Sequence, residues 1–246
     1  MKKILTAGPS ITNVEKEYVN EMMNSGWDNY KYVEKFESEF SKWHKRNFGL
    51  MTPNCTQAIH LILLSIGIRE NDEVILPELT WTATAAPITY LRAKPVFADV
   101  NEKNWCLCPN SVEKKITNKT KAIIFVDLYG NMPCIEELKK ISLKYNLPLI
   151  EDSAEALGSV YKDTRAGKFG IAGVHSFHRT KTITTGEGGF LLIDDEGIYN
   201  RAKFLRDHGR SNKIPYYTLE ATPKYMPSNL QGALALAQFQ RIDELI

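Results

Sequence analysis

The sequence of 246 residues lacks both a strong charge of one sign and a long apolar run. Its 31 Lys and Arg and 29 Asp and Glu leave a formal net charge of +2, so no broad basic surface is expected and we predict no nucleic-acid partner. The longest apolar run, residues 59–68, is too short to span a bilayer. The first ten residues also lack the hydrophobic segment of a signal peptide. We therefore predict no membrane partner.

Cysteine is scarce as well, with only Cys55, Cys106, Cys108 and Cys134. Four cysteines do not make a disulfide scaffold in a chain of this length, and the Cys106-x-Cys108 pair has no second pair at zinc-ligand spacing. We interpret all four as free thiols, which are typical of a cytoplasmic protein.

What the sequence does contain is a regular alternation of helix and strand patterns. Helical spacing of apolar residues predicts helices at 14–24, 33–46, 57–68, 82–91, 111–116, 135–145, 196–207 and 229–246. Short apolar runs predict strands at 48–51, 73–76, 96–99, 121–126, 147–151, 174–177 and 190–193. This order is typical of βαβ units, so we predict an α/β protein with a mostly parallel central sheet covered by helices on both faces.

An acidic residue, Asp152, follows the predicted strand 147–151. Ligands of open parallel sheets bind at the carboxyl ends of the strands, so this position faces the expected crevice. The competing interpretation is a helix N-cap.

A lysine, Lys181, lies between a predicted strand and a glycine-rich turn in the segment SFHRTKTITTGEGGF. Most lysines are solvated surface residues. Neighbouring threonines and closely spaced glycines favour a buried, reactive amine here instead.

The turn 54–57, between a strand and a helix, directs free backbone N–H groups to one point. Together with the helix dipole and the Thr56 hydroxyl, these groups can bind an anion, although Thr56 could equally be only a helix N-cap. The turn matches neither the GxxxxGK[ST] nor the GxGxxG nucleotide-binding pattern.

An amine, an acid and an anion site at one sheet edge are what pyridoxal 5′-phosphate (PLP) requires. The amine of Lys181 would form the Schiff base, Asp152 would keep the ring nitrogen protonated, and the turn would hold the phosphate. Trp81 is a candidate to stack on the ring, with a core position under the helix 82–91 as the alternative.

Four longer motifs carry a family resemblance: EDSAEALGS (151–159), SFHRTKTITTGEGG (176–189), LRDHGR (205–210) and SNLQGALALAQ (228–238). They closely resemble the DegT/DnrJ/StrS sugar-nucleotide aminotransferases, and the similarity runs from about Thr6 to the end. The resemblance implies the three-layer α/β/α large domain of fold type I PLP enzymes.

The resemblance also implies roles for individual residues. Lys181 matches the catalytic lysine that binds PLP covalently, and Asp152 matches the acid on the pyridine nitrogen. Glu155 falls near the phenolic oxygen of the cofactor, and Trp81 matches the stacking aromatic.

The remaining implied contacts concern the phosphate, the substrate and a second subunit. Thr56, Gln57 and Ser176 match the residues that hold the phosphate, and His178 matches a substrate or packing residue. Because members of the family form homodimers with shared active sites, Lys224 would reach the partner's cofactor.

The implied reaction is amino transfer from L-glutamate, which becomes 2-oxoglutarate, to a 4-keto-6-deoxy nucleotide sugar. C4 is the expected position, and polysaccharide biosynthesis is the expected process. A related dehydratase subgroup has His where Lys181 stands, so the lysine favours amino transfer.

Members of the family are usually longer, with a smaller C-terminal domain. We therefore expect residues 1–246 to form the PLP-binding large domain, with helices in residues 1–47 packed on it and the chain ending at the start of the usual small domain. A truncated, catalytically incomplete PLP-binding remnant, or a scaffold partner of a full-length homologue, is the alternative function.

A metal enzyme is a further alternative, because His175, His178, Asp152 and Glu155 are of ligand type. Positions three apart on a strand face opposite sides, however, so the two histidines should not bind one ion. We therefore expect no metal.

Overall fold

The structure is a computed structural model that describes residues 9–246; Thr6 and the first residues of the expected 1–246 domain lie outside this range. The helices are α1 (Asn13–Ser25), α2 (Lys31–Trp43), α3 (Cys55–Ser65), α4 (Thr82–Tyr90), α5 (Pro109–Lys115), the 3₁₀ helix η1 (Leu128–Gly130), α6 (Ile135–Tyr145), α7 (Glu196–Arg206), α8 (Asn229–Gln240) and α9 (Ile242–Leu245). The strands are β1 (Phe48–Thr52), β2 (Glu73–Pro77), β3 (Lys94–Ala98), β4 (Thr120–Val126), β5 (Leu149–Asp152), β6 (Val160–Tyr161), β7 (Thr164–Arg165), β8 (Ala172–Ser176) and β9 (Gly189–Ile193).

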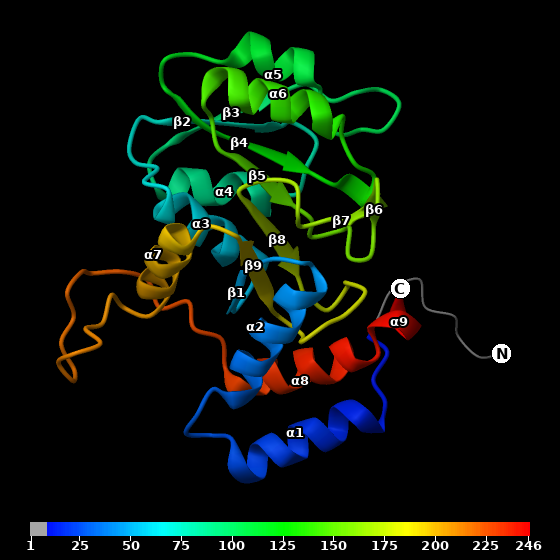
Figure 1. Ribbon diagram of the computed structural model, residues 1–246, viewed down its shortest axis with the longest axis vertical. Helices are drawn as coiled ribbons and strands as arrows, with labels where there is room; N and C mark the ends of the chain where they lie inside the picture. The colour runs from blue at the N-terminus through cyan, green and yellow to red at the C-terminus, as the bar shows by residue number, and fades with distance from the viewer. Residues whose placement is uncertain (1–8) are drawn as a thin grey trace.

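Seven strands form one sheet in the order β1-β9-β8-β5-β4-β2-β3 (Figure 1). The neighbours from β8 to β3 pair in parallel, whereas β9 is antiparallel to both β8 and β1. The prediction of a mostly parallel sheet in an α/β fold is therefore confirmed. Parallel strands end at one edge, so the carboxyl ends of β4, β5 and β8 meet there.

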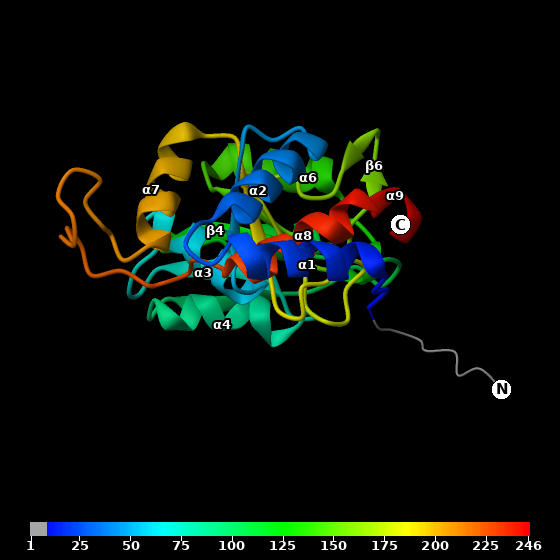
Figure 2. The same cartoon turned by 90° about the horizontal axis from the view of Figure 1, so that it is seen from below.

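Alternate residues of each central strand face opposite layers of helices. In β4, Ala122 and Ile124 join the apolar cluster that includes residues of α3, α4 and α7. Ile123 and Phe125 point the other way, into the cluster made with α5 and α6. Both faces are thus apolar and covered, which explains the unbroken apolar run of this strand. Figure 2 shows α4 on one side of the sheet and α6 on the other.

The first two helices pack against the last long one. α1 and α2 both contact α8, and α2 also contacts β1. Phe36 and Phe40 on α2 meet Phe177 and Phe190 at ring-centroid distances of 4.7–5.5 Å. Residues from both ends of the chain therefore share one core with β9.

The structure corrects several of the predicted elements. Asp152 belongs to β5, because it pairs with Val126 and Val174 on the two neighbouring strands. The predicted helix 229–246 breaks at Arg241 into α8 and α9. The hairpin of β6 and β7 was not predicted, since its strands of two residues carry too short a pattern.

No helix in the part of the chain that the structure describes has both the length and the apolarity needed to cross a bilayer. None of the four cysteines forms a disulfide.

Candidate functional site

Lys181 lines a cavity of about 260 Å³ on the carboxyl side of the sheet. The residues that line this Lys181 cavity are Tyr129, Ala154, Glu155, Leu157, Ser176, Thr180, Lys181 and Thr182. Lys181 Nζ lies 3.4 Å from Glu155 Oε1, and the other carboxylate oxygen of Glu155 accepts a hydrogen bond of 3.0 Å from the backbone N–H of Tyr129. Glu155 therefore links the lysine to the turn that follows β4.

Asp152 is the last residue of β5, the strand beside β8, which precedes Lys181 in the chain, and Asp152 is 4% exposed. Its carboxyl accepts a hydrogen bond of 2.8 Å from Thr84 Oγ1 and one of 3.2 Å from the backbone N–H of Ala154. Burial raises the pKa of Asp152, while these two hydrogen bonds and the charge of Lys181 act to lower it. A turn, not a helix, follows the strand, so the helix N-cap interpretation is wrong.

The amine, the acid and the buried Cys55 in the first turn of α3 lie at the same end of the sheet. Burial raises the pKa of Cys55; the Asp152 carboxylate raises it further and the Lys181 ammonium opposes both. Ala154, whose N–H donates to Asp152, lines the same cavity as Lys181. Gly189, at the start of β9, lies against the backbone of Asn54 and Cys55. The three segments that the sequence pointed to are therefore brought together at one end of the sheet.

The first turn of α3 has free backbone donors. Asn54 is the N-cap, and its side chain accepts a hydrogen bond of 2.9 Å from the N–H of Gln57. The interpretation of Thr56 as the N-cap is therefore wrong. Among residues 9–246, the N–H groups of Cys55 and Thr56 have no acceptor, and Gln57 Oε1 is buried without a partner. Two open N–H groups at a helix N-terminus suit an anion.

Trp81 lies at the start of α4 with 78% of its surface exposed, so the alternative of a core tryptophan is wrong. One turn further along α4, Thr84 donates the hydrogen bond to Asp152. This places Trp81 on the helix that borders the acid, with its ring open to a ligand.

The other predicted residues lie at different distances from the lysine. Ser176 lines the Lys181 cavity, and its hydroxyl accepts a hydrogen bond of 3.3 Å from the N–H of His178. The ring of His178 pairs with Thr180 Oγ1 at 3.0 Å. Lys224 is exposed and forms an ion pair with Asp207 in its own chain, and it does not line the Lys181 cavity.

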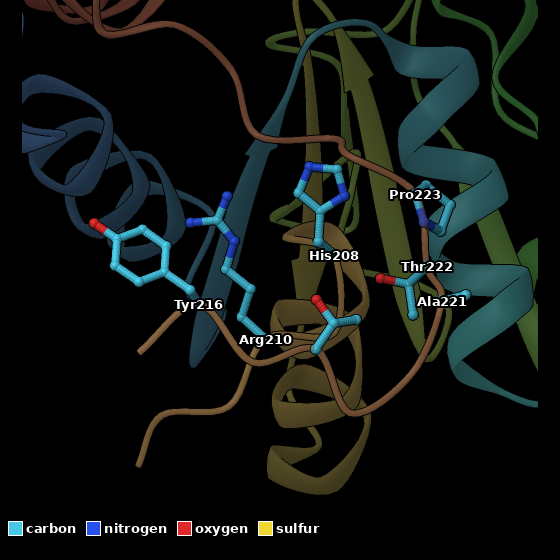
Figure 3. Close-up of a pocket in the computed structure, with 7 residues that line it drawn as sticks. His208, Arg210, Tyr216, Ala221, Thr222 and Pro223 are labelled. Atoms are coloured by element: carbon cyan, nitrogen blue, oxygen red, sulfur yellow. The ribbon is translucent and has the colours of Figure 1, made fainter. Parts of the chain in front are cut away.

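A second cavity, of about 630 Å³, lies in the segment between α7 and α8. Figure 3 shows His208, Arg210, Thr222 and Pro223 around it. None of the predicted site residues lines this cavity. Within residues 9–246, no three His, Cys, Asp or Glu side chains group to hold a metal ion.

Sequence reasoning missed two residues of the site, Thr84 and Tyr129. Tyr129 comes three residues after the end of β4, so a search beyond the strand ends could have found it. Thr84 had no comparable signal, because its hydroxyl meets Asp152 only once α4 is packed beside β5.

A second buried acid, Asp127, follows β4 and is 0% exposed. Its carboxyl faces that of Glu151, whose oxygens accept hydrogen bonds of 2.7 Å from the N–H groups of Gly167 and Phe169. Neither oxygen of Asp127 has a partner within bonding distance in the described residues. Burial raises the pKa of Asp127 well above its ordinary value, and Glu151 raises it further. Burial and the neighbouring Glu151 carboxyl therefore both favour the protonated form of Asp127.

We expect the Asp127→Asn variant to melt at a higher temperature than the wild type at about pH 7.5, because the neutral amide removes this burial penalty. The unfolded wild-type chain releases the Asp127 proton above about pH 4, while the raised pKa in the folded chain delays that release, so folding stability falls as the pH rises above about 4. The two melting temperatures should therefore converge near about pH 4. A stabilisation of 1 kcal/mol corresponds to roughly 2–4 °C. Thermal unfolding across this pH range checks the expectation, and a lower melting temperature at neutral pH would contradict it.

Comparison with known proteins gives consistent matches over the described chain. The model of the DegT/DnrJ/EryC1/StrS aminotransferase family matches residues 9–246. A GDP-perosamine synthase from Escherichia coli O157:H7 is 41% identical over 249 aligned residues, which cover 100% of this chain and 68% of that protein.

Solved structures agree with this result. An aminotransferase from Psychrobacter cryohalolentis superposes with a TM-score of 0.92 at 29% identity, over 98% of this chain and 65% of that one. The PLP form of the candidate sugar aminotransferase Spr1654 from Streptococcus pneumoniae gives 0.91 at 29% identity, over 98% and 67%. The chain thus spans about two thirds of the length of these proteins. Its sequence and its fold together show that it belongs to the DegT/DnrJ/EryC1/StrS family of PLP-dependent aminotransferases.

Proposed function

We propose that the protein transfers an amino group from L-glutamate to C4 of a 4-keto-6-deoxy nucleotide sugar, with PLP as its cofactor, in the biosynthesis of glycans that contain amino sugars. The observation that carries this proposal is the buried Asp152 carboxyl, which is bonded by Ala154 of the Lys181 cavity, at the same end of the sheet as the open first turn of α3. The GDP-perosamine synthase relative makes a GDP-linked sugar the first acceptor to test.

The described residues fit PLP in three respects. The free N–H groups of Cys55 and Thr56 provide donors for a phosphate. The buried carboxylate of Asp152 would hold a ring nitrogen in its protonated form. Lys181 Nζ has one partner, Glu155, at 3.4 Å, so the amine can be released for covalent attachment. When bound, PLP supplies the electron sink that stabilises negative charge on the reacting carbon.

The chain's own residues would then perform the remaining tasks. Lys181 Nζ would take a proton from the α-carbon of the amino donor and return it, as general base and then acid. Glu155 would orient that amine, and Ser176 would add a hydroxyl to the phosphate site. The exposed ring of Trp81 would cover the cofactor face and exclude water, and His178 would contact the substrate.

We further propose that residues 1–246 form the large domain of an enzyme that acts as a cytoplasmic homodimer, with Lys224 directed to the partner's cofactor. Exposed apolar side chains in the segment that joins α7 to α8 support this pairing: Ile214, Tyr216, Tyr217 and Leu219 are all more than half exposed. Figure 1 shows this segment projecting from the body of the protein, where a second copy can reach it.

The test is a direct assay of amino transfer. The purified protein is reconstituted with PLP and incubated with L-glutamate and, in separate reactions, GDP-, UDP- and dTDP-linked 4-keto-6-deoxy sugars. We expect a visible absorbance band from the lysine-bound cofactor, and an amino sugar detected by mass spectrometry with the GDP substrate. Cofactor binding without amino transfer to any of the three sugars would favour the incomplete remnant. The absence of any visible band would overturn the proposal.

A further inference from the structure

Gln231, in the first turn of α8, connects two loops of the candidate site. Its Nε2 donates one hydrogen bond of 3.3 Å to the carbonyl of Pro53 and one of 2.6 Å to the carbonyl of Glu187. Pro53 directly precedes the N-cap of α3, and Glu187 lies in the turn that follows Lys181. One side-chain amide therefore joins two segments. They are residues 53–57, named the phosphate-binding turn after their proposed role, and residues 177–188, named the lysine loop.

The sheet explains why these two carbonyls are neighbours. β1 and β9 are antiparallel, and their ladder ends with Thr52 opposite Gly189. The backbones are in such close contact there that a Cβ on Gly189 would lie 2.3 Å from the carbonyl carbon of Asn54. The ladder between the two strands stops at this pair, and no backbone hydrogen bond joins Pro53 to Glu187. Gln231 bridges them where the ladder stops.

The same helix holds the lysine loop at a second place. Gln238, 1% exposed, accepts a hydrogen bond of 3.3 Å from the N–H of Thr184. α8 runs beside the loop that joins β8 to β9 (Figure 1) and contacts the second half of that loop twice, at Thr184 and at Glu187. Of these two glutamines, Gln231 alone also bonds to the phosphate-binding turn.

We propose that Gln231 is a positioning residue, which sets the lysine loop relative to the phosphate-binding turn so that one PLP molecule can be held by both. This inference rests on the proposed function for the identity of the ligand. The bridge itself is a property of the protein without ligand. Loss of the amide donor frees the phosphate-binding turn from the lysine loop, and PLP must then order both segments when it binds.

Helix capping and bridging can be separated at this residue. Gln231 also forms a capping box with Ser228, in which its Oε1 accepts a hydrogen bond of 3.0 Å from the Ser228 N–H. The Gln231→Glu variant keeps that acceptor, since Ser-x-x-Glu is also a capping box, but it loses the donor to Pro53 and Glu187. Ser228→Ala removes the capping hydroxyl and keeps the donor, which makes it the matched control. Gln231→Met removes the donor without adding a charge, as a second variant.

Hydrogen–deuterium exchange of the cofactor-free proteins gives a readout that is independent of catalysis. We expect peptides that cover residues 53–57 and 182–189 to exchange faster in Gln231→Glu and Gln231→Met than in the wild type. In the titration with PLP, the dissociation constant of both variants should rise by about tenfold, as the loss of two hydrogen bonds implies. Ser228→Ala should lower the melting temperature while its exchange in these peptides and its PLP affinity stay at wild-type values.

Wild-type exchange in both Gln231 variants would overturn the inference, as would a Ser228→Ala protein that reproduces their faster exchange. If the wild type itself did not bind PLP, the proposed function would fail, whereas the exchange comparison would still decide whether Gln231 joins the two loops.

Discussion

Replacing Lys181 with alanine is expected to abolish the visible absorbance band of the reconstituted protein and to lower the turnover rate by at least about 10³-fold. Among residues 9–246, no other lysine lines the Lys181 cavity, so none of them is placed to replace the lost amine as the covalent anchor or as the group that moves the proton. Absorbance spectra and a single-turnover assay with L-glutamate measure the two losses separately.

A second substitution separates the charge of Lys181 from its chemistry. Lys181→Arg keeps a positive charge beside Glu155 and Asp152, but a guanidinium stays protonated and can act neither as nucleophile nor as base. We expect it to be as inactive as the alanine variant, with a melting temperature close to that of the wild type. Lys140→Ala, on the exposed face of α6, is the control and should change neither spectrum nor rate. Turnover by Lys181→Arg at the wild-type rate would remove Lys181 from the proposed mechanism.

The sequence was sufficient to predict the layers of the fold because their signals are local. Apolar runs such as that of β4 mark a strand buried on both faces, and the order of runs and helices indicates a parallel sheet. Boundaries were less accurate where a distant contact decides them. The predicted helix 33–46 ends at Trp43, for example, because Arg46 turns inward to donate hydrogen bonds to the carbonyls of Gly167 and Gly170, more than 120 residues away.

The same distinction applies to the site. Asp152 could be singled out because the end of a parallel strand is a known place for a ligand, and Lys181 because of its unusual neighbours. Thr84 and Gln231 act through contacts that exist only after α4 and α8 have packed, across 68 residues to Asp152 and 178 residues to Pro53. The Lys224 interpretation depends on a second subunit, which no pattern within one chain can place.

Asp152→Asn is expected to lower the turnover rate by roughly 10²-fold or more while Lys181 still binds PLP covalently. Asparagine has nearly the shape of aspartate and can accept the hydrogen bond from Thr84. It carries no negative charge, so it cannot stabilise the protonated ring nitrogen that the proposed reaction uses. Comparing the rate with L-glutamate against the intensity of the visible band isolates this loss.

Stability should change in the opposite direction. Because burial raises the pKa of Asp152 in the folded protein, its ionised form is unfavourable there at neutral pH, and stability is lost as the pH rises above about 4. The asparagine variant avoids this cost, so its cofactor-free form should melt at or above the wild-type temperature at about pH 7.5.

If Asp152 served the fold, its replacement would instead lower the melting temperature and leave turnover unchanged. Thr84→Val tests the hydrogen bond to Asp152 without changing the charge of the acid. This variant keeps the Asp152 charge but removes one of its hydrogen bonds, so we expect a loss of about tenfold in turnover, smaller than that of Asp152→Asn. An Asp152→Asn protein with near wild-type turnover and a clearly lower melting temperature would show that the acid supports the fold and not the reaction. Among the described residues, Asp152 accepts two hydrogen bonds but forms no ion pair, and Lys181 pairs with Glu155 instead. A buried carboxylate without a cationic partner costs stability in the cofactor-free protein, which is the arrangement expected of a site that binds a cationic group of a ligand.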